Sequence, residues 1–111
     1  MNFETIQNKN TAIIKTLMEK LDASNASTLK SELVVLNKNG VNTMVLDLSS
    51  TKYCDSSGLS AILAANRLCK ESSGKFILSG LNSTVKKLIE ISQLDKVLTI
   101  TESLEEAKQL I

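Results

Sequence analysis

The residues best suited to chemistry are the hydroxyls of Ser56 and Ser57, which stand between Asp55 and Gly58. An apolar run precedes them and apolar residues at helical spacing follow from Leu59, so a buried strand leads into a helix here. The start of a helix favours negative charge, because its first N–H groups lack partners and the helix dipole is positive there. A phosphate on one of these serines would be stabilised. We therefore interpret the segment as a phosphorylation switch.

Simple helix capping explains the same four residues, because Asp and Ser are preferred N-cap residues and Gly tolerates a tight entry. Catalysis by serine is poorly supported, since the chain has no His for a Ser-His-Asp triad and no G-x-S-x-G sequence. No Gly-Lys-Ser/Thr follows Gly58, which excludes a P-loop. Asp22, Asp47 and Asp55 could be drawn as a Mg²⁺ cluster, but each has a capping or partner-binding explanation. We expect no catalytic residues, no metal and no cofactor.

Composition indicates one soluble domain covering residues 1–111, with 42% apolar and 23% charged residues. The 13 basic and 12 acidic residues give a net charge of +1, which offers no reason to expect nucleic-acid binding. Two cysteines without His cannot supply four zinc ligands, so Cys54 and Cys69 are interpreted as reduced structural thiols. No apolar stretch is long enough to span a membrane, and Met1–Glu4 lacks the features of a signal peptide. These observations predict a cytoplasmic protein.

The elements that position the serines alternate in type from residue 43 onward. Strands are predicted over Thr43–Leu48, Lys75–Ser79 and Val97–Thr101. Helices are predicted from Leu59, from Ser83 and from Ser103, the last with Leu104, Ala107, Leu110 and Ile111 facing inward. Right-handed crossovers would make these strands parallel, with helices packed against the sheet. The segment is therefore part of an α/β domain.

The first half of the chain is less uniform. Phe3–Gln7 alternates as an edge strand, and a helix is predicted from Ala26 to the Gly at position 40. Between them, Thr11–Leu21 is ambiguous. Its apolar residues fall at helical spacing, whereas the short strand and Asn-rich turn before it suit a hairpin.

The chain resembles a STAS domain over nearly its whole length, and within that family the single-domain anti-sigma factor antagonists. The strongest element is Val45-Leu46-Asp47-Leu48, followed after six residues by Asp55-Ser56-Ser57-Gly58-Leu59. Leu21-Asp22-Ala23 and Leu78-Ser79-Gly80-Leu81-Asn82 are supporting matches. The resemblance implies a four- to five-stranded mixed sheet with helices mainly on one face, in the order ββαβαβαβα. It also implies a strand in Thr11–Leu21.

The resemblance further implies partner switching in bacterial transcription. In such antagonists the second serine of D-S-S-G, here Ser57, is phosphorylated by an anti-sigma factor that is a serine kinase of the GHKL type. The unphosphorylated antagonist binds this kinase and frees the sigma factor, and a PP2C-type phosphatase resets the switch. Partner contact is implied for Asp22, Asp55, Ser56, Ser57 and Gly58, with Asp55 capping the helix and Gly58 letting the chain turn.

Two other functions are compatible with the same fold. One is a STAS subunit bound to an ABC transporter ATPase in lipid trafficking, and the other is a stressosome scaffold, although such scaffolds usually carry an additional N-terminal sensor domain. The intact D-S-S-G-L sequence favours the switch. One departure from the family affects Asp22, because many members have Gly where this chain has Lys20. The loop before Asp22 is therefore expected to be stiffer.

Overall fold

The computed structural model describes residues 3–111. Its strands are β1 (Phe3–Asn8), β2 (Thr11–Thr16), β3 (Lys20–Leu21), β4 (Thr43–Asp47), β5 (Tyr53–Cys54), β6 (Phe76–Ser79) and β7 (Thr99–Thr101). Its helices are α1 (Ala26–Lys38), α2 (Ser56–Glu71), α3 (Ser83–Ile91) and α4 (Leu104–Gln109), with a 3₁₀ turn, η1, at Leu94–Lys96. Apart from β3, β5 and η1, the order is the predicted one.

Five strands form one mixed sheet in the order β1-β2-β4-β6-β7. Only the β1–β2 pair is antiparallel within this sheet, and the neighbours from β2 to β7 are parallel. β4 is buried along its full length, as expected for the centre of a parallel sheet. The predicted mixed sheet is confirmed.

The ambiguous segment contains a strand, β2, and this confirms the hairpin interpretation. Ile14 belongs to the main core, whereas Ile13 packs with Val45 and Ile77 on the opposite face of the sheet. Both faces of β2 therefore need apolar residues. Adjacent apolar residues of this kind imitate helical spacing in the sequence.

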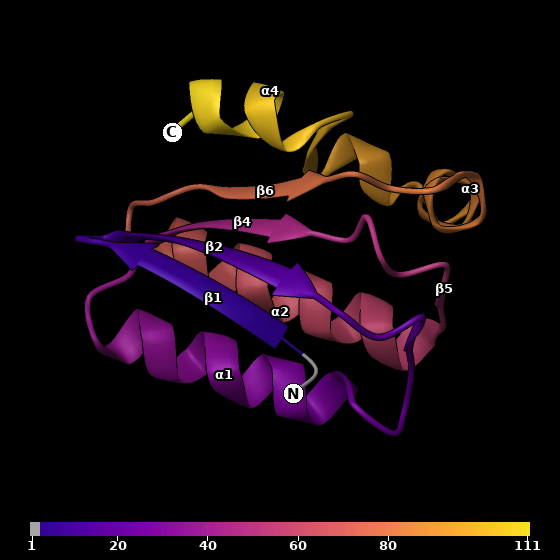
Figure 1. The fold of residues 1–111 in the computed structure, drawn as a ribbon, viewed down its shortest axis with the longest axis horizontal. Coiled ribbons are helices and arrows are strands. Elements are labelled where there is room, and N and C mark those ends of the chain that lie inside the picture. The colour runs from indigo at the N-terminus through magenta and orange to yellow at the C-terminus, as the bar shows by residue number, and fades with distance from the viewer. Residues whose placement is uncertain (1–2) are drawn as a thin grey trace.

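The helices lie mainly on one face. α1 and α2 pack side by side beneath the sheet, and α4 lies on the opposite side of β4 and β6 (Figure 1). Ala107 of α4 is fully buried. Leu110 and Ile111 are 43% and 47% exposed, so the prediction that they face inward is wrong. The reason is that α4 ends at Gln109, so Leu110 and Ile111 are not part of the helix and do not continue its buried face.

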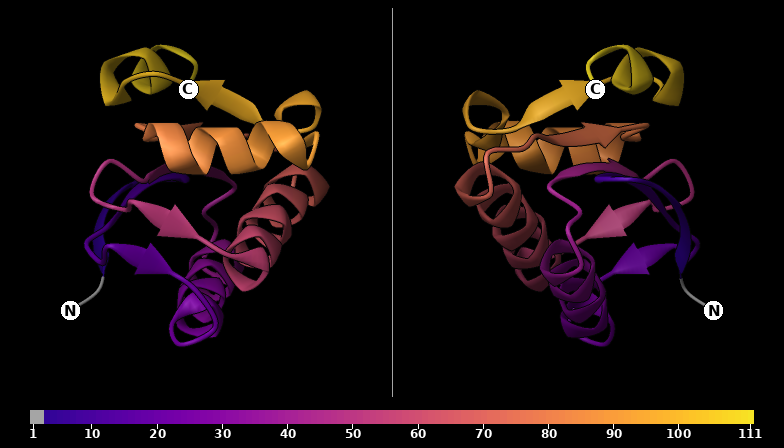
Figure 2. Two further views of the ribbon diagram at one scale, coloured as in Figure 1. Left: turned by 90° about the vertical axis from the view of Figure 1, so that its right-hand side faces the viewer. Right: turned by 90° about the vertical axis from the view of Figure 1, so that its left-hand side faces the viewer.

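A second sheet, not predicted, consists only of β3 and β5. The two strands are parallel, with Lys20 opposite Tyr53 and Leu21 opposite Cys54. Figure 2 shows these two short arrows side by side, away from the main sheet. Each strand continues directly into the segment before a helix, so this small sheet fixes where α1 and α2 begin.

Candidate functional site

The site is built on the start of α2. Asp55 is the N-cap residue, with an extended backbone, and its Oδ1 accepts a hydrogen bond of 3.1 Å from the Gly58 N–H. This confirms that Asp55 caps the helix. The capping carboxylate also supplies negative charge where the helix dipole favours it.

Ser56 and Ser57 are the first two residues of the helix rather than part of a preceding turn. Gly58 and Leu59 are buried against the core. Because successive residues of a helix are separated by about 100° around its axis, the two serines flank this buried side in opposite directions. Ser56 is exposed and Ser57 is half-buried, and neither hydroxyl forms a hydrogen bond within residues 3–111.

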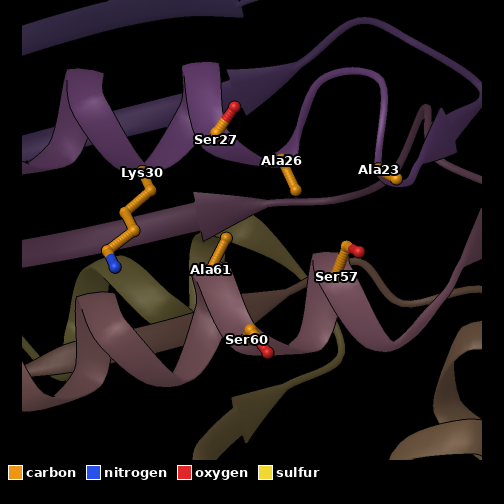
Figure 3. A pocket seen from close by; sticks show the side chains of 7 residues that line it. All are labelled: Ala23, Ala26, Ser27, Lys30, Ser57, Ser60 and Ala61. Atoms are coloured by element: carbon orange, nitrogen blue, oxygen red, sulfur yellow. The ribbon is translucent and has the colours of Figure 1, made fainter.

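Ser57 lines a cleft of about 300 Å³ between α1 and α2. Small side chains dominate it, and Ala26 and Ala61 form buried parts of its lining. Lys30 extends from α1 toward α2 at one end of this cleft, with Ala61 between it and Ser57 (Figure 3). Lys30 is the only charged residue among those that line the cleft. We call this space the α1–α2 cleft.

Ser56 lines a different cavity, of about 480 Å³, which we call the β5–α3 groove. The groove has an apolar lining from Tyr53, Leu88 and Ile91, the last of which is 73% exposed, and one basic residue, Lys87. The Asn82 amide donates a 3.1 Å hydrogen bond to the Lys52 carbonyl. This bond ties the start of α3 to the segment before β5.

Gly58 has a different role from the one predicted. It lies within the helix and does not have a positive φ, so it is not the residue that lets the chain turn. A Cβ at Gly58 would lie 2.5 Å from the Leu21 carbonyl oxygen and 2.5 Å from Cys54 Sγ. Gly is required here because α2 approaches the β3–β5 sheet too closely for any side chain.

Asp22 lies at the same end of the β3–β5 sheet as Asp55. Leu21 pairs with Cys54, and the Asp55 N–H donates to the Leu21 carbonyl at 3.2 Å. The Asp22 carboxylate accepts hydrogen bonds from the Ser24 hydroxyl at 2.6 Å and the Ser24 N–H at 3.0 Å. These bonds, the hydroxyl first, lower the pKa of Asp22. The Asp22 carboxylate therefore shapes its own loop, and within residues 3–111 it forms no hydrogen bond with Ser56 or Ser57.

The cysteines are unsuited to nucleophilic chemistry. Burial, with a smaller effect from Asp55, raises the pKa of Cys54 to about 12, and burial raises the pKa of Cys69 to about 11. Both thiols are therefore protonated at neutral pH. Across residues 3–111, no three His, Cys, Asp or Glu side chains are grouped closely enough to hold a metal ion. No helix in that part of the chain is long and apolar enough to cross a membrane.

The structure adds residues that sequence reasoning missed. Ser27 and Lys30 of α1 line the same cleft as Ser57 and Ser60 of α2, although the hydroxyls of Ser27 and Ser60 point away from the opposite helix (Figure 3). Each pair has a spacing of three residues, which places its members on one helix face. That spacing was visible in the sequence, but the packing of α1 against α2 that brings the pairs together was not.

Comparison with known proteins agrees with this geometry. The STAS domain family model matches residues 2–107. A candidate anti-sigma factor antagonist of Bordetella bronchiseptica, BtrV, is 28% identical over 95 residues, covering 86% of this chain and 82% of BtrV. A crystal structure of a candidate anti-sigma factor antagonist from Thermotoga maritima is 24% identical with a TM-score of 0.89, covering 98% of this chain and 93% of that one.

The anti-sigma factor antagonist SpoIIAA is more distant. Its unphosphorylated form is 19% identical with a TM-score of 0.75, covering 96% of this chain and 93% of that one. Its phosphorylated form, from Bacillus, is 20% identical with a TM-score of 0.76, covering 98% and 99%. These two likenesses show a shared fold.

Proposed function

The chain belongs to the STAS domain family, and we propose that it acts as an anti-sigma factor antagonist controlled by phosphorylation of Ser57. In this proposal the unphosphorylated chain binds an anti-sigma factor that is a serine kinase of the GHKL type. That binding releases the sigma factor. The names of BtrV and SpoIIAA support this class of function.

The observation that carries the proposal is the position of the Ser57 hydroxyl. It lies in the first turn of α2, next to a capped helix start, and makes no hydrogen bond within the described residues. Modification therefore breaks no bond of the fold. The dipole of a 16-residue helix favours the added negative charge.

The chemical step is a phosphoryl transfer. Ser57 Oγ attacks the γ-phosphorus of ATP held by the kinase, the bond from that phosphorus to the β–γ bridging oxygen breaks, and ADP leaves. The hydroxyl proton passes to a base of the kinase, since this chain has no His and both its thiols are protonated. The chain supplies the acceptor hydroxyl and has no catalytic activity of its own.

The switch follows from charge at the partner surface. A phosphate adds about −1.5 to −2 charges beside Ser56, Asp55 and the Asp22 loop, where the partner would dock. Such a change repels a partner surface that accommodated a neutral hydroxyl. A PP2C-type phosphatase reverses it: water attacks the phosphorus, the bond to Ser57 Oγ breaks, and inorganic phosphate leaves as the hydroxyl is restored.

The test is to capture the partner from native lysate and incubate the complex with ATP. We expect a GHKL-type kinase and one phosphate, mapped by mass spectrometry to Ser57. Ser57→Ala should keep partner binding and lose phosphate uptake, whereas Ser56→Ala should keep both. If Ser56→Ala alone abolishes uptake, the acceptor is the first serine. Recovery of an ABC transporter ATPase with an unmodified chain would overturn the proposal.

A further inference from the structure

The α1–α2 cleft contains a basic residue without an acidic partner. Lys30 forms no salt bridge within residues 3–111, where the ion pairs are Lys52–Glu19 and Lys108–Glu105. Its neighbours three and four residues away on α1 are Ala26, Ser27, Leu33 and Val34, so no acid on that helix face can pair with it. Its charge is therefore available to a group that enters the cleft.

The Ser57 side chain opens into this cleft. Ser57 and Lys30 both line a space of about 300 Å³, in which Lys30 extends from α1 toward α2 at the end beyond Ala61 (Figure 3). The flexible Lys30 side chain would therefore turn toward Ser57 to meet a phosphate there. Ser27 and Ser60 are also on the lining, but their hydroxyls point away from the opposite helix (Figure 3), so Lys30 is the polar side chain of this lining that extends from α1 toward α2. No acidic side chain lines the cleft.

The two carboxylates close in sequence to the lining residues Ala23 and Ser57 already accept hydrogen bonds elsewhere. Asp55 accepts the Gly58 N–H as the helix cap, and Asp22 accepts from Ser24 in its own loop. Neither occupies the position opposite Lys30. The groove beside Ser56 is lined by a different cation, Lys87 of α3.

We infer that Lys30 is the intramolecular counter-ion of phosphorylated Ser57 and holds the phosphate in the α1–α2 cleft. This inference rests on the proposed function, because it assumes that Ser57 carries the phosphate. It adds that the phosphate is bound by the antagonist's own α1. The phosphate then alters the surface of both helices, since it neutralises Lys30 as well as adding charge at Ser57.

The test places phosphoserine at position 57 during translation, so that no kinase is needed. The second pKa of the phosphate is then followed by ³¹P NMR during a pH titration. A nearby cation favours the doubly ionised phosphate and lowers this pKa. An exposed pair gives a shift of about half a pH unit. We therefore expect Lys30→Met to raise the phosphate pKa by that amount, and Lys30→Arg to restore the wild-type value.

Lys87→Met is the matched control, because it removes the same charge from α3, which lines the groove beside Ser56, and is expected to leave the phosphate pKa unchanged. Met and Lys have similar helix propensities, and the melting curve of each unphosphorylated variant checks that the fold is retained. An unchanged pKa in Lys30→Met, or an equal rise in Lys87→Met, would overturn the inference. Failure of a partner kinase to modify Ser57 concerns the proposed function and is measured separately.

Discussion

Ser56 and Ser57 are adjacent in the sequence but lie in different surroundings. Ser57 faces a cleft lined by small side chains and one lysine, between two helices packed side by side. Ser56 faces a larger, mainly apolar groove with exposed Tyr53 and Ile91. The cleft therefore suits a charged modification at Ser57, whereas the groove beside Ser56 is mainly apolar. The cleft and the groove both adjoin the start of α2, and the buried side of this helix separates them.

The different surroundings of Ser56 and Ser57 depend on the orientation of α2. Leu59→Asp tests this orientation most strongly, because Leu59 is on the side of the helix that faces the core. Leu59 is 9% exposed, so the variant buries an unpaired charge or forces the helix to rotate. We expect a loss of about 4 kcal/mol in the free energy of unfolding, measured by urea denaturation. Ser56→Asp is the control and should be near neutral, because its charge is exposed in the first helical turn. Equal stability of the two variants would mean that α2 is oriented differently.

Gly58→Val tests the close contact beneath both serines. The new Cβ would overlap the Leu21 carbonyl and Cys54 Sγ, so α2 must move away from the β3–β5 sheet. We expect a loss of about 3 kcal/mol by urea denaturation. Gly40→Ala is the control. Gly40 has φ of 98° but no atom within 4 Å of a new Cβ, so only backbone strain of about 1 kcal/mol is expected.

Aspartate substitutions compare the effect of a negative charge at Ser57 with that at Ser56. Ser57→Asp should weaken binding of the captured partner at least tenfold, which is about 1.4 kcal/mol. Ser56→Asp should weaken it less, because its charge is one residue away and on the other flank of the helix. Calorimetric titration with the purified partner measures both. A stronger effect at Ser56 would reverse the roles assigned to the two sides.

Asp55→Ala removes the cap that both serines share. The Gly58 N–H would lose its 3.1 Å acceptor, and we expect a loss of about 1 kcal/mol in the free energy of unfolding. Asp55→Asn keeps a capping oxygen and should lose much less. A thermal melt of each variant provides the measurement. An equal loss in both would indicate that the charge, rather than the hydrogen bond, is responsible.

The smallest expected effect is the pH dependence of Asp22. Its pKa is lowered in the folded protein by Ser24, so its contribution to stability is present above the unfolded value of about 3.9. That contribution is lost as the pH falls through the lower folded value. The difference in melting temperature between wild type and Asp22→Asn should therefore be constant from about pH 5 to 7 and shrink below about pH 4. A difference that does not change with pH would exclude an ionised Asp22 as its source.

Much of the fold could be predicted because the central strands β4 and β6 are buried runs, and because α2, α3 and α4 begin at capping side chains. Residue type predicted a helix cap within Asp55–Gly58, and the family resemblance assigned it to Asp55. The two-residue strands β3 and β5 could not be predicted, since two residues carry no periodicity and their partners are 33 residues apart. The role of Gly58 depends on this pairing and was missed for the same reason. Lys30 was missed because its relation to Ser57 exists only once α1 packs against α2.

The β3–β5 sheet has a consequence for local unfolding. The Glu19 carbonyl accepts the Lys52 N–H at 2.7 Å and the Tyr53 N–H at 3.1 Å, and the Leu21 carbonyl accepts the Asp55 N–H. These few bonds join the segment before α1 to the segment before α2. An opening that breaks them would release both segments together, and the amides of Tyr53 and Asp55 would then show matching protection factors in hydrogen–deuterium exchange. The start of α2 is in this sense one cooperative unit with a stretch of chain more than 30 residues earlier.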